Sequence, residues 1–274
     1  MSLDDKKNYL LETKNQIKAA IQQKGVIVQD TDTFRSYATK IGEIQSGGDH
    51  TNIFSTIWET SNNYNMIIQK LAKEIPNDIL QEAFNNQNVI RMDQSFAYCQ
   101  NLEKLDLSNC KVDTVTSMSN LCTGSTKLKQ IIMKKLNLKS VTQINSAFSN
   151  LKELQEIDFT NTDTSNISNF LTMCSGCSNL IRFIGILDVI SNTGNIANIV
   201  NGCTNLEEIY IKNLNSSGLK LNSSSKLKKE CLVYLLENAI ASTETRTINM
   251  GTNNIAKLTA EEIAVATNKG WTLS

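Results

Sequence analysis

The chain has 274 residues, and its 27 basic and 27 acidic side chains give a formal net charge of zero. This balance provides no overall field that would attract nucleic acid, and no apolar run approaches the roughly 20 residues that a membrane-spanning helix needs. We therefore expect no nucleic-acid binding and no membrane insertion. The opening residues, MSLDDKKNYLLETKNQ, lack the apolar centre of a signal peptide, which predicts synthesis in a cytoplasm without an export signal.

Residues 1–46 are expected to form a helical segment that anchors the protein and supports oligomerisation. Apolar residues recur there at helical spacing in two runs. A pair of helices of this length is marginal alone, so we expect it to pack on another protein or on copies of itself. The predicted anchor residues are Leu3, Leu10, Ile17, Ile21, Phe34, Tyr37 and Ile41. A linker at 47–52 and an N-terminal cap with a degenerate repeat at 53–92 are expected to follow.

Residues 93–214 repeat apolar positions with a period of 26. The first apolar column is Leu102, Leu128, Leu154, Leu180 and Leu206. The second is Leu105, Ile131, Ile157, Phe183 and Ile209, and the third is Leu107, Met133, Phe159, Gly185 and Ile211. A period of 20–29 residues with this spacing is typical of leucine-rich repeats, whose stacked units share one core. The predicted fold class is an α/β solenoid of leucine-rich repeats with a 26-residue period, preceded by a small α-helical anchor.

Residues 215–274 are expected to close the stack as a C-terminal cap in the order helix, strand, helix, strand. Apolar spacing predicts the first helix over 223–241, with serines available as its N-cap. The stretch TRTINM is expected to be a strand. Thr259 and Glu262 are spaced as a capping box for the second helix, and Gly270 suits the position just after its end. Trp271 then begins a last short strand.

Two repeat segments carry a family resemblance. SFAYCQNLEKLDLSNCKVDTVTSM (95–118) and DTSNISNFLTMCSGCSNL (163–180) resemble the BspA-type bacterial leucine-rich repeat, whose units carry D-T-S-N-V-T-N-M followed by M-F-x-x-C-x-x-L. The resemblance covers about residues 92–214 and implies a solenoid that binds or adheres at surfaces, without catalytic residues. Residues 14–44 resemble N-terminal segments of phage and prophage tail, fibre and baseplate-associated proteins, and the C-terminal end is similar to that of phage structural proteins. These resemblances imply a phage or prophage origin.

The residues that could carry catalysis or bind metal have simpler explanations. Cys174 and Cys177 form a CxxC, which could be half of a zinc site or a redox pair. Both fall on columns of the repeat, where cysteine behaves as a small apolar core residue. His50, the single histidine, stands beside a glycine pair in the predicted linker. We therefore expect no enzyme activity, no metal and no cofactor, and an enzyme that uses a cysteine is the least favoured hypothesis.

The outward face of the predicted strands is the candidate partner-binding surface. Solenoids usually bind partners on such a face. The candidate residues there are Ile132, Ile184, Tyr210, Lys104, Arg182 and Lys212. The three apolar residues are expected to be exposed within rows of charges. The simpler alternative is scattered surface hydrophobes among charged side chains that are merely solvated.

These patterns predict a non-enzymatic phage virion structural protein, a tail or head fibre or a decoration protein. It would anchor through its N-terminus and display the leucine-rich repeats for host-surface recognition. The expected partners are other virion proteins, a host surface protein or glycan, and copies of the chain in a homo-oligomer, with the trimer of phage fibres as the model. The expected location is the virion, after synthesis in the host cytoplasm. The alternative is a bacterial surface leucine-rich-repeat adhesin.

Overall fold

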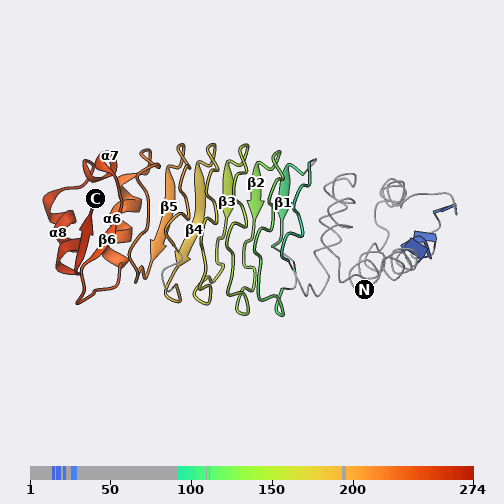
Figure 1. Ribbon diagram of the computed structural model, residues 1–274, viewed down its shortest axis with the longest axis horizontal. Helices are drawn as coiled ribbons and strands as arrows, with labels where there is room; N and C mark the ends of the chain where they lie inside the picture. Colours follow the sequence, from blue (N-terminus) through green and yellow to red (C-terminus); the bar gives the residue numbers. More distant parts are fainter. Residues whose placement is uncertain are drawn as a thin grey trace, which may run out of the picture.

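Five short strands in the centre of the chain form one parallel sheet. The computed structural model describes residues 14–15, 17–19, 21–22, 26–29, 92–100, 102–108, 110, 112–192 and 196–274. The strands are β1 (Lys104–Asp106), β2 (Gln130–Ile132), β3 (Glu156–Asp158), β4 (Arg182–Asp188) and β5 (Glu208–Lys212). They lie side by side in chain order (Figure 1). Lys104 lies opposite Gln130, and Gln130 lies opposite Glu156, so neighbouring strands are offset by the 26-residue period of the sequence. We call each 26-residue unit a coil.

The core of the stack is made of the apolar columns. Because side chains alternate along a strand, the central residue of each short strand points inward while its neighbours point outward. Every member of the first two apolar columns is buried, with at most 3% of its surface exposed. Phenylalanines fill the centre of the stack, where the ring of Phe159 lies 6.3 Å from that of Phe148 and 5.0 Å from that of Phe183.

The third apolar column was predicted wrongly at Gly185. The offset between β4 and β5 falls from 26 residues at Arg182 to 24 residues at Ile186, because β4 contains a bulge between these two residues. Leu187, rather than Gly185, therefore lies opposite Ile211 and is fully buried. Gly185 has a φ of +104°, and a Cβ atom there would lie 2.8 Å from the carbonyl carbon and oxygen of Phe159. The backbone of β4 thus approaches the preceding coil at a position that only glycine fits.

Backbone hydrogen bonds also join the coils on the side away from the sheet. The amide of Phe96 donates to the carbonyl of Leu121 at 2.9 Å, and the amide of Cys122 donates to that of Ala147 at 2.8 Å. Inside the same turns, small polar side chains donate to a carbonyl of the preceding coil. Cys177 donates to Phe148 at 2.8 Å, as do Cys203 to Cys174 and Ser224 to Cys203. These cysteines are core residues, and they also satisfy carbonyls that would otherwise be buried without a partner.

Helices close the C-terminal end of the stack. The elements after β5 are α6 (Lys229–Asn238), β6 (Arg246–Ile248), α7 (Thr252–Ile255), α8 (Ala260–Asn268) and β7 (Trp271–Leu273). They gather beyond β5 (Figure 1), where α6 packs on β5, α8 packs on α6 and β7, and β6 pairs with β7 in parallel. The capping box of Thr259 and Glu262 is present. The short α7 was not predicted from the sequence.

The first cap helix is shorter than the sequence suggested, and no serine caps it. Lys228 stands at its N-cap position without a side-chain hydrogen bond. The preceding serines are engaged in the stack instead: Ser223 accepts a hydrogen bond from the amide of Gly202, and Ser224 donates to the carbonyl of Cys203. The sequence therefore continues the coil pattern up to residue 228, and the helix begins only after it. At its other end, the Lys269 ammonium donates to the carbonyls of Leu236 and Ala239.

Only part of the predicted N-terminal anchor lies in the described residues. Residues 14–15, 17–19 and 21–22 are helical, and Ile17 and Ile21 are fully buried. Met92, the last residue of the predicted N-terminal cap, is also buried. The other predicted anchor residues, the linker at 47–52 and the cap at 53–91 lie outside the described residues. The outside anchor residues are Leu3, Leu10, Phe34, Tyr37 and Ile41.

Candidate functional site

The charged residues predicted to bind a partner differ in how available they are. Lys104 is exposed at the start of β1. The Arg182 guanidinium lies 2.7 Å from the Glu156 carboxylate on the neighbouring strand, and the Lys212 ammonium lies 3.1 Å from Asp188. Charges of opposite sign on adjacent strands hold each other in this way along much of the face. The expectation that these charges are merely solvated is therefore wrong for the two pairs.

The predicted apolar residues are less exposed than expected. Ile132 and Ile184 are half-buried. Tyr210 is half-buried as well, because its ring packs edge-on against Tyr234 of α6 with centroids 5.3 Å apart. The exposed isoleucines of this region are instead Ile181, just before β4, and Ile186, which takes the place opposite Tyr210 because of the bulge. The partner-binding role of the six predicted residues stays a prediction.

The aspartates of the sheet face stabilise the strand ends. The Asp158 carboxylate accepts a hydrogen bond from the amide of Thr160 at 2.9 Å and pairs with the Lys134 ammonium at 3.0 Å. Burial raises the pKa of Asp158, but the hydrogen bonds from Thr160 and Lys134 outweigh burial and hold this pKa below its ordinary value. The carboxyl group is therefore ionised at neutral pH and serves the turn and the adjacent coil.

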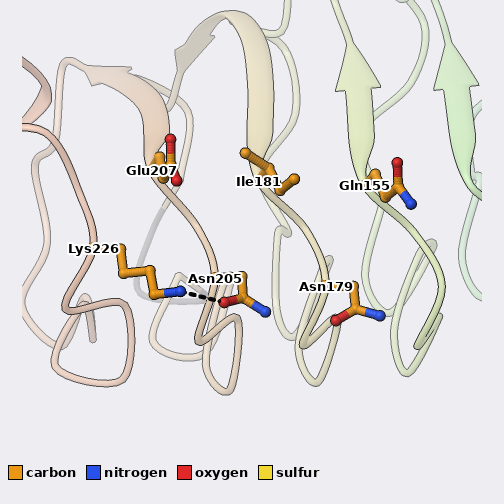
Figure 2. Close-up of a pocket in the computed structure, with 6 residues that line it drawn as sticks. All are labelled: Gln155, Asn179, Ile181, Asn205, Glu207 and Lys226. Carbon is orange, nitrogen blue, oxygen red and sulfur yellow. Dashed lines mark hydrogen bonds between the residues drawn. The ribbon is translucent and has the colours of Figure 1, made fainter.

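A hollow opens beside the sheet, at the ends where β4 and β5 begin. Its volume is about 360 Å³, and we call it the groove. Two rows of side chains line it (Figure 2). One row consists of Gln155, Ile181 and Glu207, and the other of Asn179, Asn205 and Lys226. A second hollow of about 270 Å³ shares Gln155 and Ile181 with the groove and extends it toward β2.

Several polar side chains of the groove have no partner in the protein. The Lys226 ammonium donates to the Asn205 amide oxygen at 2.7 Å, and the Asn205 amide nitrogen donates to the carbonyl of Ser178. Among the residues that the structure describes, the side chains of Gln155, Asn179 and Glu207 make no hydrogen bond or ion pair, and all three are exposed. Their polar atoms are thus available to a ligand.

Sequence reasoning missed the groove, although a signal exists in the repeat. The column one residue after the first leucine column reads Glu103, Lys129, Gln155, Ile181 and Glu207. Ile181 is an isoleucine in an otherwise polar column, and 39% of its surface is exposed. An apolar side chain that faces solvent within such a column marks a place where packing does not explain the residue type.

The geometry of the described residues offers no nucleophile. All seven cysteines lie in this part of the chain, and all are free and buried. Burial raises the pKa of Cys177 to about 12 and that of Cys110 to about 12, so their thiols stay protonated and unreactive. No group of three metal-binding side chains occurs within the described ranges. A search of the same ranges finds no helix with the length and apolarity needed to cross a bilayer.

Comparisons with known proteins identify the family. The model of the family described as "Mycoplasma protein of unknown function, DUF285" matches residues 61–186 and 144–223. Neither a curated protein nor a solved structure matches the chain. The two matched segments together span more than half of the sequence, and they include all five strands of the parallel sheet. This family is compatible with the resemblance to BspA-type repeats. The chain therefore belongs to the DUF285 family of Mycoplasma proteins of unknown function.

Proposed function

We propose that the protein is a non-enzymatic recognition protein, built as a leucine-rich-repeat solenoid that presents a partner-binding surface along its sheet. The observation that carries this proposal is the contrast between its two kinds of side chain. The reactive thiols are all buried, whereas polar side chains of successive coils stand exposed and without protein partners at the groove. Such an arrangement suits binding through many side chains and leaves no group positioned to act on a bound molecule.

The leading biological setting is a phage virion, as a tail or head fibre or a decoration protein. Its support is the resemblance of residues 14–44 to segments of phage tail and baseplate-associated proteins, and the burial of Ile17 and Ile21 within that segment. In this setting residues 1–46 attach the chain to other virion proteins or to its own copies, and the coils face the host surface.

Immunogold labelling of the full chain tests the setting. An antibody against the chain is applied to particles induced from the encoding bacterium and to intact cells of the same culture. Regular labelling on particles supports the virion role. Deleting residues 1–46 should then remove the label from particles, while a tryptic digest and a melting curve check that the coils remain folded. Particles without any label would refute the virion role.

A bacterial surface adhesin is the second candidate, favoured by the bacterial genus in the family description and by the resemblance to BspA-type repeats. In this case the label should lie on intact cells, and protease added to those cells should remove it. The recognition function is common to both candidates. Therefore, the labelling decides only where the coils are displayed.

A further inference from the structure

We infer that the groove binds a neutral oligosaccharide that lies along the stack of coils. This inference rests on the proposed recognition function and names the ligand class for one site. It is drawn from the side chains that are free in the groove, the charges that are not, the state of the backbone beneath them, and the spacing of the rows.

The available groups suit a ligand that both donates and accepts hydrogen bonds. The amides of Gln155 and Asn179 each carry two donor hydrogens and one acceptor oxygen, and Glu207 adds a carboxylate acceptor. Between them, Ile181 offers an exposed aliphatic surface. A sugar ring matches this combination, because its hydroxyl groups both donate and accept while its C–H face is apolar.

The charges around the groove argue against an anionic ligand. Its cations are already engaged: Lys226 donates to Asn205 at 2.7 Å, and Arg182 pairs with Glu156 at 2.7 Å. In the second hollow, Lys129 pairs with Glu103 at 2.9 Å. The charged group that has no partner among the described lining residues is the carboxylate of Glu207. A sulfated or phosphorylated ligand would therefore meet a free negative charge and no free positive charge.

The backbone beneath the groove is fully used, which argues against an extended peptide added as a strand. The amide of Gln155 donates to Lys129, that of Ile181 to Gln155, that of Glu207 to Ile181, and that of Lys228 to Glu207, each at 2.9 Å. Strand addition needs an edge with unpaired amides and carbonyls. Any ligand of the groove must instead be held by side chains.

The rows also repeat in space. Gln155, Ile181 and Glu207 occupy the same position on adjacent coils, and neighbouring strands lie about 4.8 Å apart. A ligand with repeating units can contact one coil after another. This geometry favours a chain of several sugars over a single sugar, because a volume of about 360 Å³ open at the surface encloses little of a small molecule.

The test uses the full chain and a printed array of defined probes. The array carries neutral hexasaccharides of glucose, galactose, mannose and N-acetylglucosamine, heparin hexasaccharides as the anionic arm, and unmodified peptides as the protein arm. We expect binding to at least one neutral hexasaccharide, which then serves as the ligand for titration calorimetry. Binding to heparin or peptides alone, or to none of the probes, would overturn the inference.

Matched variants connect the binding to the groove. Gln155→Ala should weaken binding of the selected hexasaccharide about tenfold, because a ligand hydroxyl loses its partner. Gln143→Ala removes another exposed glutamine of the stack that lies outside the groove, and it should change binding less than about twofold. In the same way Ile181→Ala is compared with Ile190→Ala, since these isoleucines are 39% and 41% exposed. Equal effects within either pair would place the sugar elsewhere and refute the groove as its site.

The outcome is separable from that of the proposed function. If the immunogold experiment places the protein on particles or cells but the array shows no neutral sugar, recognition survives and the ligand class is wrong. If neutral sugars bind through the groove but no surface carries the protein, the proposed setting fails and the site stands.

Discussion

The bulge at Gly185 makes a sharp prediction about how closely the coils approach each other. Replacing Gly185 with alanine puts a Cβ atom 2.8 Å from the carbonyl carbon and oxygen of Phe159, and the residue must keep a φ of +104°. Both contacts are with backbone, so no side-chain rotation can relieve them. Gly218 provides the matched control, since its φ is +99° but the nearest atom to its added Cβ, the Cβ of Ala197, is 3.9 Å away.

The two glycines separate the conformational cost from the steric cost. A left-handed backbone costs an L-residue about 1–2 kcal/mol, and the loss of freedom in the unfolded chain returns about 0.4–1 kcal/mol. Gly218→Ala should therefore lower the free energy of unfolding by about 1 kcal/mol. Gly185→Ala adds the cost of overpacking, about 1–3 kcal/mol, for a total of about 2–4 kcal/mol.

Urea denaturation of both variants measures these free energies, with circular dichroism and tryptophan fluorescence as independent probes of one transition. A larger loss of stability for Gly185→Ala than for Gly218→Ala is the expected result. Equal losses would show that the backbone of β4 does not approach Phe159 closely, and the explanation of the register shift would then be wrong.

Three further changes probe the stack. Iodoacetamide at pH 8 should leave the seven buried cysteines of the folded protein unmodified, since burial raises the pKa of Cys177 to about 12, and mass spectrometry after rapid quenching would reveal any native-state labelling. Asp158 has a lowered pKa in the folded state, so it stabilises the protein above the ordinary aspartate pKa and loses this effect as the pH falls. Urea midpoints at pH 6 and pH 3 should therefore differ less for Asp158→Asn than for the unaltered chain. Phe159→Ala should cost about 3–5 kcal/mol by leaving a cavity, whereas Leu171→Ala, at an exposed site, should cost under about 0.5 kcal/mol in the same assay.

The interior of the stack could be predicted from the sequence because burial and register follow the same period. A residue such as Ile157 needs only its neighbours at 131 and 183 to be recognised as interior. The prediction failed at Gly185, where β4 carries two residues more than the constant step allows. Simple counting continued to give an offset of 26, and only the backbone hydrogen bonds show that Leu187 turns inward.

The candidate site was harder to predict because its residues share no pattern of type. Gln155 and Asn179 belong to different columns, and each column is filled by unlike side chains on other coils. Whether such groups are free depends on which neighbours take up their partners. Arg182 looked available in the sequence but is bound to Glu156, whereas Gln155 looked ordinary and has no side-chain partner in the described part of the chain.

The separation between the backbone ladder and the side chains above it has an evolutionary consequence. Amides and carbonyls alone join Gln155, Ile181 and Glu207 from coil to coil, so their side chains can mutate without disturbing the architecture. Gaining or losing a whole unit of 26 residues would lengthen or shorten these rows by one member while keeping every remaining pair in step. Lineages of this family can therefore diversify what they recognise by substitution at a few outward positions or by changing the number of units.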